Sequence, residues 1–492
     1  MTSIAKARSP IKFILLLLSV TACFIVGGLF VITPSLKRDG VLRGGGPSLH
    51  ARLKRIGEIP KALPNYPTAN YPPPTKTTSK PPSTTHSRTK TLEMVVSGEL
   101  LLTSFKRVKG TLIGSFCAVD WQARKKDPAL FSFYGDLAKA SGCKVKGSTF
   151  SVNLKDAVDA CREYDQAHAR LPLEPAGFVL HESRCGSTLA ANVLEVVSNS
   201  TRVYAEAPHL PSALKQRAYV DKLSSSTDKG KEEADATSFG STPDPDQTEL
   251  LRDVHYLASR SPSGPKETFY KFTTVANWDL DPILDAFPET PWIYIMRNPV
   301  EVMMSYRKET TTMTTSLKKK KGVDMGGLGF SNSSNCVRKK FHRTPELQNE
   351  VRQYGLYQKW AAKGMDDLPN HVYCAAHLAV INGIALELYR ERPGGMFVDY
   401  SGLVETLKHE VIPNHFGFEL DEDAIARIDE VGGTYSKASR KINKKLNPMN
   451  ESSAKEWVED SAKKTDSAPD FVFDIVDLML EEGYKQMLAL AV

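Results

Sequence analysis

The stretch AGFVLHESRCGSTLAANVLEVV, residues 176–197, decides the fold. AGFVLH is a short apolar run typical of a buried strand, and the residues that follow it read as a loop and an amphipathic helix. At such a junction, backbone N–H groups and the helix dipole converge on an anion. The sequence therefore predicts a phosphate-binding loop at residues 181–188.

This loop differs from the GxxxxGK[ST] loop of nucleotide hydrolases, whose Lys neutralises phosphates and whose Ser or Thr holds Mg²⁺. His181 stands in place of the first Gly, and Ser187 stands in place of the Lys. The cation is instead Arg184, two residues before Gly186, which suits a metal-free site for a less charged phosphosulfate group. A purely structural strand–turn–helix would also account for the pattern.

Other apolar runs extend the α/β pattern outward from this stretch. Strands are expected at 202–205, 268–274, 292–296 and 395–400, separated by helices such as 282–287 and 374–390. Alternation of this kind predicts an α/β fold with a central parallel sheet flanked by helices. The 492 residues are enough for such a domain and a small appendage. The net charge of +7 favours anionic ligands, and without a basic stripe with interleaved aromatics we expect no nucleic-acid binding.

The N-terminus carries an apolar segment. Residues 13–32 contain no charge and are long enough to cross a hydrocarbon core of about 30 Å as a helix. Lys6, Arg8 and Lys12 in the tail 1–12 favour a cytosolic N-terminus and a lumenal remainder, a single-pass type II topology. Cationic residues beyond the segment weaken this orientation, and a cleaved signal peptide is the alternative.

The rest of the chain divides by composition. Residues 33–100 include a Pro/Thr/Ser/Lys-rich run and read as a stem, 101–172 as an N-terminal cap, and 173–492 as the catalytic domain. Within that domain, 224–246 and 310–343 read as disordered insertions, the second holding the lysine run 318–321.

The seven cysteines are relevant to whether the protein lies in an oxidising cellular compartment. Cys23 lies in the apolar segment and Cys185 in the loop, while the other five could form two disulfides in an oxidising lumen or remain thiols: Cys117, Cys143, Cys161, Cys336 and Cys374. Asn199, Asn332 and Asn450 begin N-x-S/T triplets, which would accept glycans only in a secretory compartment.

Two motifs resemble those of the sulfotransferase superfamily. The run Arg184-Cys185-Gly186-Ser187-Thr188 is similar to that family's 5′-phosphosulfate loop, [RK]-[SC]-G-[ST]-[ST]. The run WIYIMRNPVEVMMS, residues 292–305, resembles its strand, R-[DN]-P loop and later Ser, which bind the 3′-phosphate. Arg297 leaves a buried strand, Asn298 suits a helix N-cap, Pro299 suits the first helical position and Ser305 lies two turns on. The resemblance covers residues from about 176 to the C-terminus and implies a P-loop nucleotide-binding α/β fold for them.

The resemblance implies roles for residues elsewhere. Glu206, after the second strand, matches the general base of several members, tyrosylprotein sulfotransferases among them, although it could simply pair with a helix dipole. His209 is the alternative base. Lys271 matches a family Lys that faces the departing phosphate, although a strand-end lysine can also snorkel to solvent. Ser436, Lys437 and Arg440 match only loosely the basic loop that closes over the nucleotide, because the RKG form is absent.

The expected activity is sulfuryl transfer from 3′-phosphoadenosine 5′-phosphosulfate, without a metal, to a hydroxyl of a glycan, a protein tyrosine or a small molecule. The expected place is the Golgi membrane, where the enzyme could form a homodimer. One rival is a lumenal glycosyltransferase with a metal-binding DxD pair, for which the chain offers Asp244-Pro-Asp246 and Asp279-Leu-Asp281. The other is a non-catalytic nucleotide-binding scaffold.

Overall fold

The computed structural model describes residues 88–145, 147–214, 245–264, 266–274, 276, 280–307, 369–434 and 461–492. The chain divides into two compact units, Met1–Thr75 and Lys76–Val492, and all described residues belong to the second. The expected cytosolic tail, membrane helix, most of the stem and the second insertion lie outside the described residues. So do Ser436, Lys437, Arg440 and residues 224–244 of the first insertion.

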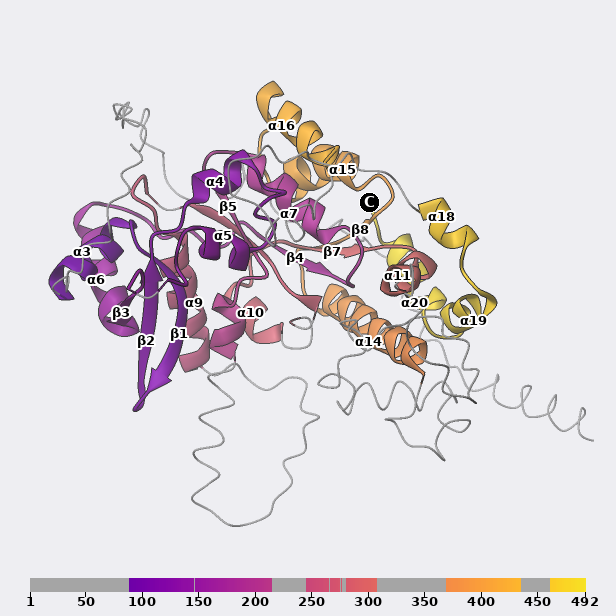
Figure 1. The fold of residues 1–492 in the computed structure, drawn as a ribbon, viewed down its shortest axis with the longest axis horizontal. Helices are drawn as coiled ribbons and strands as arrows, with labels where there is room; N and C mark the ends of the chain where they lie inside the picture. The colour runs from indigo at the N-terminus through magenta and orange to yellow at the C-terminus, as the bar shows by residue number, and fades with distance from the viewer. Residues whose placement is uncertain are drawn as a thin grey trace, which may run out of the picture. The chain divides into compact units, whose positions relative to one another are not determined.

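Five parallel strands form the central sheet (Figure 1). They are β4 (Gly177–His181), β5 (Thr201–Ala205), β6 (Glu267–Lys271), β7 (Trp292–Met296) and β8 (Gly395–Asp399), in the spatial order β5-β6-β4-β7-β8. Every neighbouring pair runs parallel. The expected α/β fold with a central parallel sheet is therefore confirmed, and β4, which precedes the candidate phosphate loop, is the middle strand.

Helices cover both faces of this sheet, which explains why the strands are apolar throughout rather than alternating. Phe178 and Leu180 of β4 pack into one apolar cluster, whereas Val179 packs into another on the opposite face. The Val179 face is covered by α7 (Ser187–Val196), α15 (Leu403–Thr406), η5 (Leu407–His415) and α16 (Glu422–Gly432). The Phe178 face is covered by α9 (Pro245–Ser259), α10 (Asp281–Ala286) and part of α14 (Asn370–Glu391).

A third apolar cluster joins α14 to α11 (Pro299–Tyr306) and α19 (Asp470–Met479). Helix α18 (Ser461–Asp466) lies against α11, and α20 (Glu481–Ala489) lies against α14 and α19. Among the described residues, α14 alone is long and apolar enough to cross a membrane by length and composition, and 72% of its most apolar window is buried inside the fold. Packing in the core therefore accounts for its apolar sequence.

The region before β4 folds around a second, smaller sheet. Strands β1 (Leu101–Val108), β2 (Thr111–Cys117) and β3 (Phe150–Asn153) are antiparallel, in that order. Helix α3 (Arg88–Ser97) precedes this sheet, α4 (Trp121–Lys126) and α5 (Tyr134–Ala140) lie between β2 and β3, and α6 (Leu154–Ala167) follows β3. The structure thus differs from the expected boundaries, because 88–100, assigned to the stem, already fold. Val95 and Leu100 are buried there, and apolar residues of this kind gain free energy by packing rather than remaining in a tether.

The cap and the central sheet share one continuous apolar core, so the cap is not a separate domain. A buried ion pair fastens them together. Arg124 of α4 donates its Nε to Glu195 of α7 at 2.9 Å, and both side chains are inaccessible to solvent. The same carboxylate accepts the backbone N–H of Val203 in β5. The helix that begins at the candidate phosphate loop is therefore fixed from the cap side.

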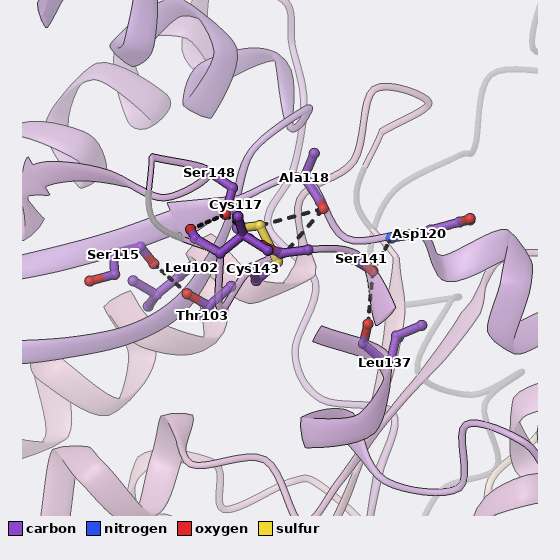
Figure 2. Close-up of a disulfide and its surroundings, with 12 residues drawn as sticks. Leu102, Thr103, Ser115, Cys117, Ala118, Asp120, Leu137, Ser141, Cys143 and Ser148 are labelled. Atoms are coloured by element: carbon purple, nitrogen blue, oxygen red, sulfur yellow. Dashed lines mark hydrogen bonds between the residues drawn. A yellow bond between two sulfur atoms is a disulfide. The ribbon is translucent and has the colours of Figure 1, made fainter. Parts of the chain in front are cut away.

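One disulfide closes the middle of the cap (Figure 2). It joins Cys117, the last residue of β2, to Cys143, just after α5, and so brackets α4 and α5. Cys374 is also disulfide-bonded. Cys161 and Cys185 are buried thiols. The sequence left this pairing open, because spacing alone does not determine connectivity.

Candidate active site

The loop that follows β4 has an unusual backbone. Ser183 and Arg184 adopt left-handed conformations, with φ of 84° and 59°, and Gly186 follows with φ of 83°. Non-glycine residues in this region store strain of about 1–3 kcal/mol each, and such residues cluster at functional sites. Left-handed residues also turn successive N–H groups toward one concave side, where an anion can bind.

The first turn of α7 adds hydroxyl groups to this loop. Ser187 and Thr188 are the first two residues of this helix, and each is 5% exposed. Their backbone N–H groups belong to the helix's first turn, which has no intrahelical acceptor. The loop therefore presents both side-chain and backbone donors at the N-terminus of a buried helix.

His181 occupies the position of a glycine in hydrolase loops, and its ring stabilises the loop through hydrogen bonds. Its Nδ1 accepts the backbone N–H of Ser183 at 3.0 Å, and its Nε2 lies 3.0 Å from the carbonyl oxygen of Phe272. Because a carbonyl oxygen only accepts, the proton is on Nε2 and the lone pair is on Nδ1. The neutral ring thus ties the left-handed turn to the end of β6, a role that the sequence did not reveal.

The second predicted motif has the expected local geometry. Asn298 is the N-cap of α11 and its side chain accepts the N–H of Val300 at 2.9 Å, with Pro299 at the first helical position. Arg297 is 5% exposed. Its Nε donates to Glu301 at 2.5 Å and its terminal nitrogen donates to Ser461 at 3.1 Å. This guanidinium is therefore held in place at the carboxyl end of β7.

The two predicted anion-binding motifs meet. A terminal nitrogen of Arg184 donates to the backbone oxygen of Ser305 at 3.0 Å. The ring of Tyr400, directly after β8, links the same loops: the guanidinium carbon of Arg297 lies 4.0 Å from its centroid, and a Cβ at Gly186 would lie 2.7 Å from its carbons. Sequence analysis did not single out Tyr400, although its position at the end of a parallel strand placed it at the same sheet edge.

Gly186→Ala is expected to weaken binding of a phosphorylated ligand about tenfold or more. The added methyl group would clash with the Tyr400 ring, and alanine is disfavoured at φ of 83°. Isothermal titration calorimetry with adenosine 3′,5′-bisphosphate measures the effect. Gly110→Ala is the matched control, because it also has a left-handed φ, of 85°, but meets no atom within 4 Å. Equal loss of affinity in both variants would argue against the predicted role of Gly186.

Glu206 and Lys271 form an ion pair at the ends of the neighbouring strands β5 and β6. The Nζ of Lys271 lies 2.5 Å from an Oε of Glu206, and the N–H of Glu206 donates to the Lys271 carbonyl oxygen at 2.7 Å. Glu206 has φ of 53°, which makes it the third non-glycine residue with a left-handed backbone at this sheet edge, after Ser183 and Arg184. The lysine side chain is 2% exposed and the glutamate 31%. A carboxylate within reach of solvent can accept a proton, and a buried ammonium can stabilise negative charge.

Residues of the cap lie beside the Glu206–Lys271 ion pair. The Nζ of Lys271 lies 5.7 Å from the centroid of the Phe133 ring, which is buried just before α5. His209, three residues after Glu206, also contacts the cap: its Nε2 lies 2.6 Å from the Leu102 carbonyl oxygen, and its ring packs edge-on against Tyr134. Burial lowers the pKa of His209 to about 4. The structure thus brings Glu206 and Lys271 together and places the His209 ring between cap and sheet.

The remaining candidates are positioned as follows. Cys185 is fully buried, and burial raises its thiol pKa to about 12, so only its backbone is available to a ligand. Of the two DxD pairs, Asp244 and Asp279 lie outside the described residues. Asp246 is in α9, and Asp281 pairs with Arg392 at 3.3 Å. No group of three or more His, Cys, Asp or Glu side chains that could hold a metal occurs in the part of the chain that the structure describes.

Comparison with known proteins gives distant likenesses only. No protein-family model and no curated protein matches the chain. Among solved structures, it is similar to a sulfotransferase domain from the Synechococcus PCC 7002 olefin synthase (15% identity, 52% of this chain and 78% of that one, TM-score 0.26). It is also similar to a sulfotransferase domain from the curacin biosynthetic pathway (12%, 65% and 97%, TM-score 0.29). A third is the sulfotransferase STF9 from Mycobacterium avium (13%, 63% and 76%, TM-score 0.27). At these TM-scores the likenesses carry no functional argument, so any functional assignment depends on the site residues themselves.

Proposed function

We propose that this protein is a sulfotransferase, which transfers the sulfuryl group of 3′-phosphoadenosine 5′-phosphosulfate to an acceptor hydroxyl. The observation that carries the proposal is the meeting of the two predicted anion-binding loops at one sheet edge, through the Arg184–Ser305 hydrogen bond and the shared Tyr400 ring. A nucleotide with phosphate-type groups at both its 3′ and 5′ positions needs two such sites close together. The carboxyl edge of a parallel sheet is also where ligands bind in open α/β folds.

In this proposal the donor's two anionic ends bind different loops. The 5′-phosphosulfate would bind the loop of residues 184–188, through backbone N–H groups, the Ser187 and Thr188 hydroxyls and the Arg184 guanidinium. The 3′-phosphate would bind Arg297 and Ser305, with bidentate contacts available from the planar guanidinium. Arg297 is already oriented by Glu301 and Ser461, so little side-chain entropy remains to be lost on binding.

Glu206 and Lys271 would carry out the chemistry. The acceptor oxygen forms a bond to sulfur while the bond from sulfur to the phosphate oxygen breaks, and the acceptor proton goes to the Glu206 carboxylate. Lys271 and Arg184 stabilise the charge that develops on the leaving phosphate and on the sulfuryl oxygens. The products are the sulfated acceptor and adenosine 3′,5′-bisphosphate. The ammonium of Lys271 also keeps the Glu206 carboxylate oriented.

The acceptor and the setting are extensions of this proposal. The acceptor would be a hydroxyl of a glycan, a protein tyrosine or a small molecule, beside the partly exposed Glu206 and the Phe133 ring. The apolar segment 13–32 would anchor the enzyme in the Golgi membrane with its catalytic domain in the lumen, an oxidising compartment compatible with the Cys117–Cys143 bond. A homodimer would fit the same setting.

Ligand-dependent thermal shift tests the proposal directly. Adenosine 3′,5′-bisphosphate at a hundred times its Kd should stabilise the protein by about 2.7 kcal/mol and raise its Tm. A nucleoside diphosphate with Mn²⁺ should leave the Tm unchanged, and the opposite result would favour a glycosyltransferase. Transfer of labelled sulfate from the donor to a mixed panel of glycans and peptides then distinguishes an enzyme from a scaffold that binds the nucleotide without turnover.

A further inference from the structure

The buried carboxylate of Glu182 connects the two predicted anion-binding loops through hydrogen bonds. It follows β4 directly and is 1% exposed. One of its oxygens accepts the backbone N–H of Arg297 at 2.5 Å, and its own N–H donates to the carbonyl oxygen of Ile295 in β7. The residue that begins the loop after β4 thus holds the backbone of the residue that begins the loop after β7.

The second carboxylate oxygen of Glu182 enters a buried network on α14. It accepts the side-chain amide of Asn382 at 3.2 Å, and the amide oxygen of Asn382 accepts the hydroxyl of Tyr294 at 2.6 Å. This chain of groups can also accommodate a protonated Glu182. The carboxylic acid would then donate to the Asn382 oxygen after the amide turns over, and the amide nitrogen would donate to the Tyr294 oxygen. The Glu182 side chain can therefore hydrogen-bond to Asn382 in either protonation state.

The charge on this network lies where the donor's negative charges are expected to bind. Burial raises the pKa of Glu182 to about 8, hydrogen bonds from Arg297 and Asn382 partly offset the rise, and Asp399 adds to it. The groups that face Glu182 are Arg297 after β7, Asp399 at the end of β8, the neighbouring thiol of Cys185, and the phenols of Tyr294, Tyr306 and Tyr484 on β7, α11 and α20. Burial raises the pKa of every one of these phenols and of the thiol, so none of them titrates near neutrality.

We propose that Glu182 is a positioning residue that couples donor binding to uptake of a proton, becoming neutral when the nucleotide's phosphates occupy the two loops. This inference rests on the proposed function, because it assigns Glu182 to the same donor site. Glu182 itself does not touch the nucleotide; it fixes the Arg297 backbone against the loop of Arg184. A bound anion above this carboxylate favours its protonated form, since like charges in a low-dielectric interior repel strongly.

The proton coupling has a defined pH window. At a pH below the pKa of Glu182 in the free protein, this carboxyl is already protonated and makes no contribution to the pH dependence of binding. Above that pKa the free protein must take up a proton to bind, so affinity falls as pH rises. With a pKa of about 8 in the free protein, we expect the affinity for adenosine 3′,5′-bisphosphate to fall about tenfold between pH 7 and pH 9.

The experiment is calorimetric titration of the whole protein with adenosine 3′,5′-bisphosphate, at pH 7, 8 and 9, in buffers of different ionisation enthalpy. The wild-type protein should take up about half a proton per nucleotide at pH 8. Glu182→Gln, which keeps the acceptor for the Arg297 N–H, should bind with no such uptake and with a flatter pH profile. Glu163→Gln, an exposed position on α6, is the matched control and should behave as the wild type.

Two outcomes would overturn the inference. One is nucleotide binding by the wild-type protein without proton uptake between pH 7 and pH 9, a result that needs no variant to fold. The other is an equal proton uptake in Glu182→Gln. In both cases the nucleotide still binds, so the proposed sulfotransferase function survives; absence of nucleotide binding altogether would instead overturn the proposed function.

Discussion

Lys271→Ala is expected to lower kcat for sulfuryl transfer by about 10²–10³, with a much smaller change in KM for the acceptor. The ammonium of Lys271 is buried at the sheet edge beside Glu206, and in the proposed reaction it meets charge that develops only as the donor bond breaks. An interaction made mainly in the transition state affects kcat rather than ground-state binding. Initial rates with labelled donor and a saturating acceptor measure the loss.

Lys155→Ala is the control for the lysine variant, because that ammonium is exposed on α6 and pairs with Asp159. It should leave the rate unchanged. The Tm of both variants should be recorded, because Lys271→Ala also leaves the partly exposed Glu206 without its partner. A correctly folded Lys271→Ala protein with full activity would remove Lys271 from the mechanism.

Glu206→Gln is expected to reduce kcat by about 10²–10⁴, the range for loss of a general base. The amide oxygen can still accept a hydrogen bond from Lys271, so this variant removes the proton acceptor while the contact between the two side chains is retained. Stopped assays of labelled sulfate incorporation at several pH values measure it. Glu163→Gln again provides the control at an exposed position.

The same assays test His209, the alternative general base. His209 has no solvent-accessible surface and lies 2.6 Å from the Leu102 carbonyl oxygen, so His209→Asn should act mainly through stability and cap docking. Substantial turnover in Glu206→Gln, together with its abolition in a folded His209→Asn protein, would move the role of base to His209.

The parts of the fold that the sequence predicted are those set by local pattern. The β4–loop–α7 unit and the β7–loop–α11 unit each combine an apolar strand with a helix start, and nearby residues determine both. The order of the strands in the sheet is not a local property. It nevertheless decides that the loops after β4 and β7 are neighbours, and therefore that Arg184 reaches Ser305.

The site residues that the sequence did not reveal act through contacts distant along the chain. Tyr400 contacts Arg297 and the Gly186 turn, Glu182 contacts Arg297 and Asn382, and Phe133 comes from the cap, which lies outside the region of resemblance. Nothing in the residues around them marks these roles. The folding of residues 88–100 has a related cause, since burial of Val95 and Leu100 depends on the rest of the cap.

At Ser183, Arg184 and Glu206, the left-handed backbone brings the proposed catalytic function into conflict with thermal stability. Glycine adopts this conformation without steric conflict, so glycine at these positions would relieve strain. At Arg184 and Glu206, however, it would delete the group on which the proposed reaction depends. Selection of variants for heat resistance alone would therefore enrich inactive proteins, and any programme to stabilise this protein should leave these backbone positions untouched.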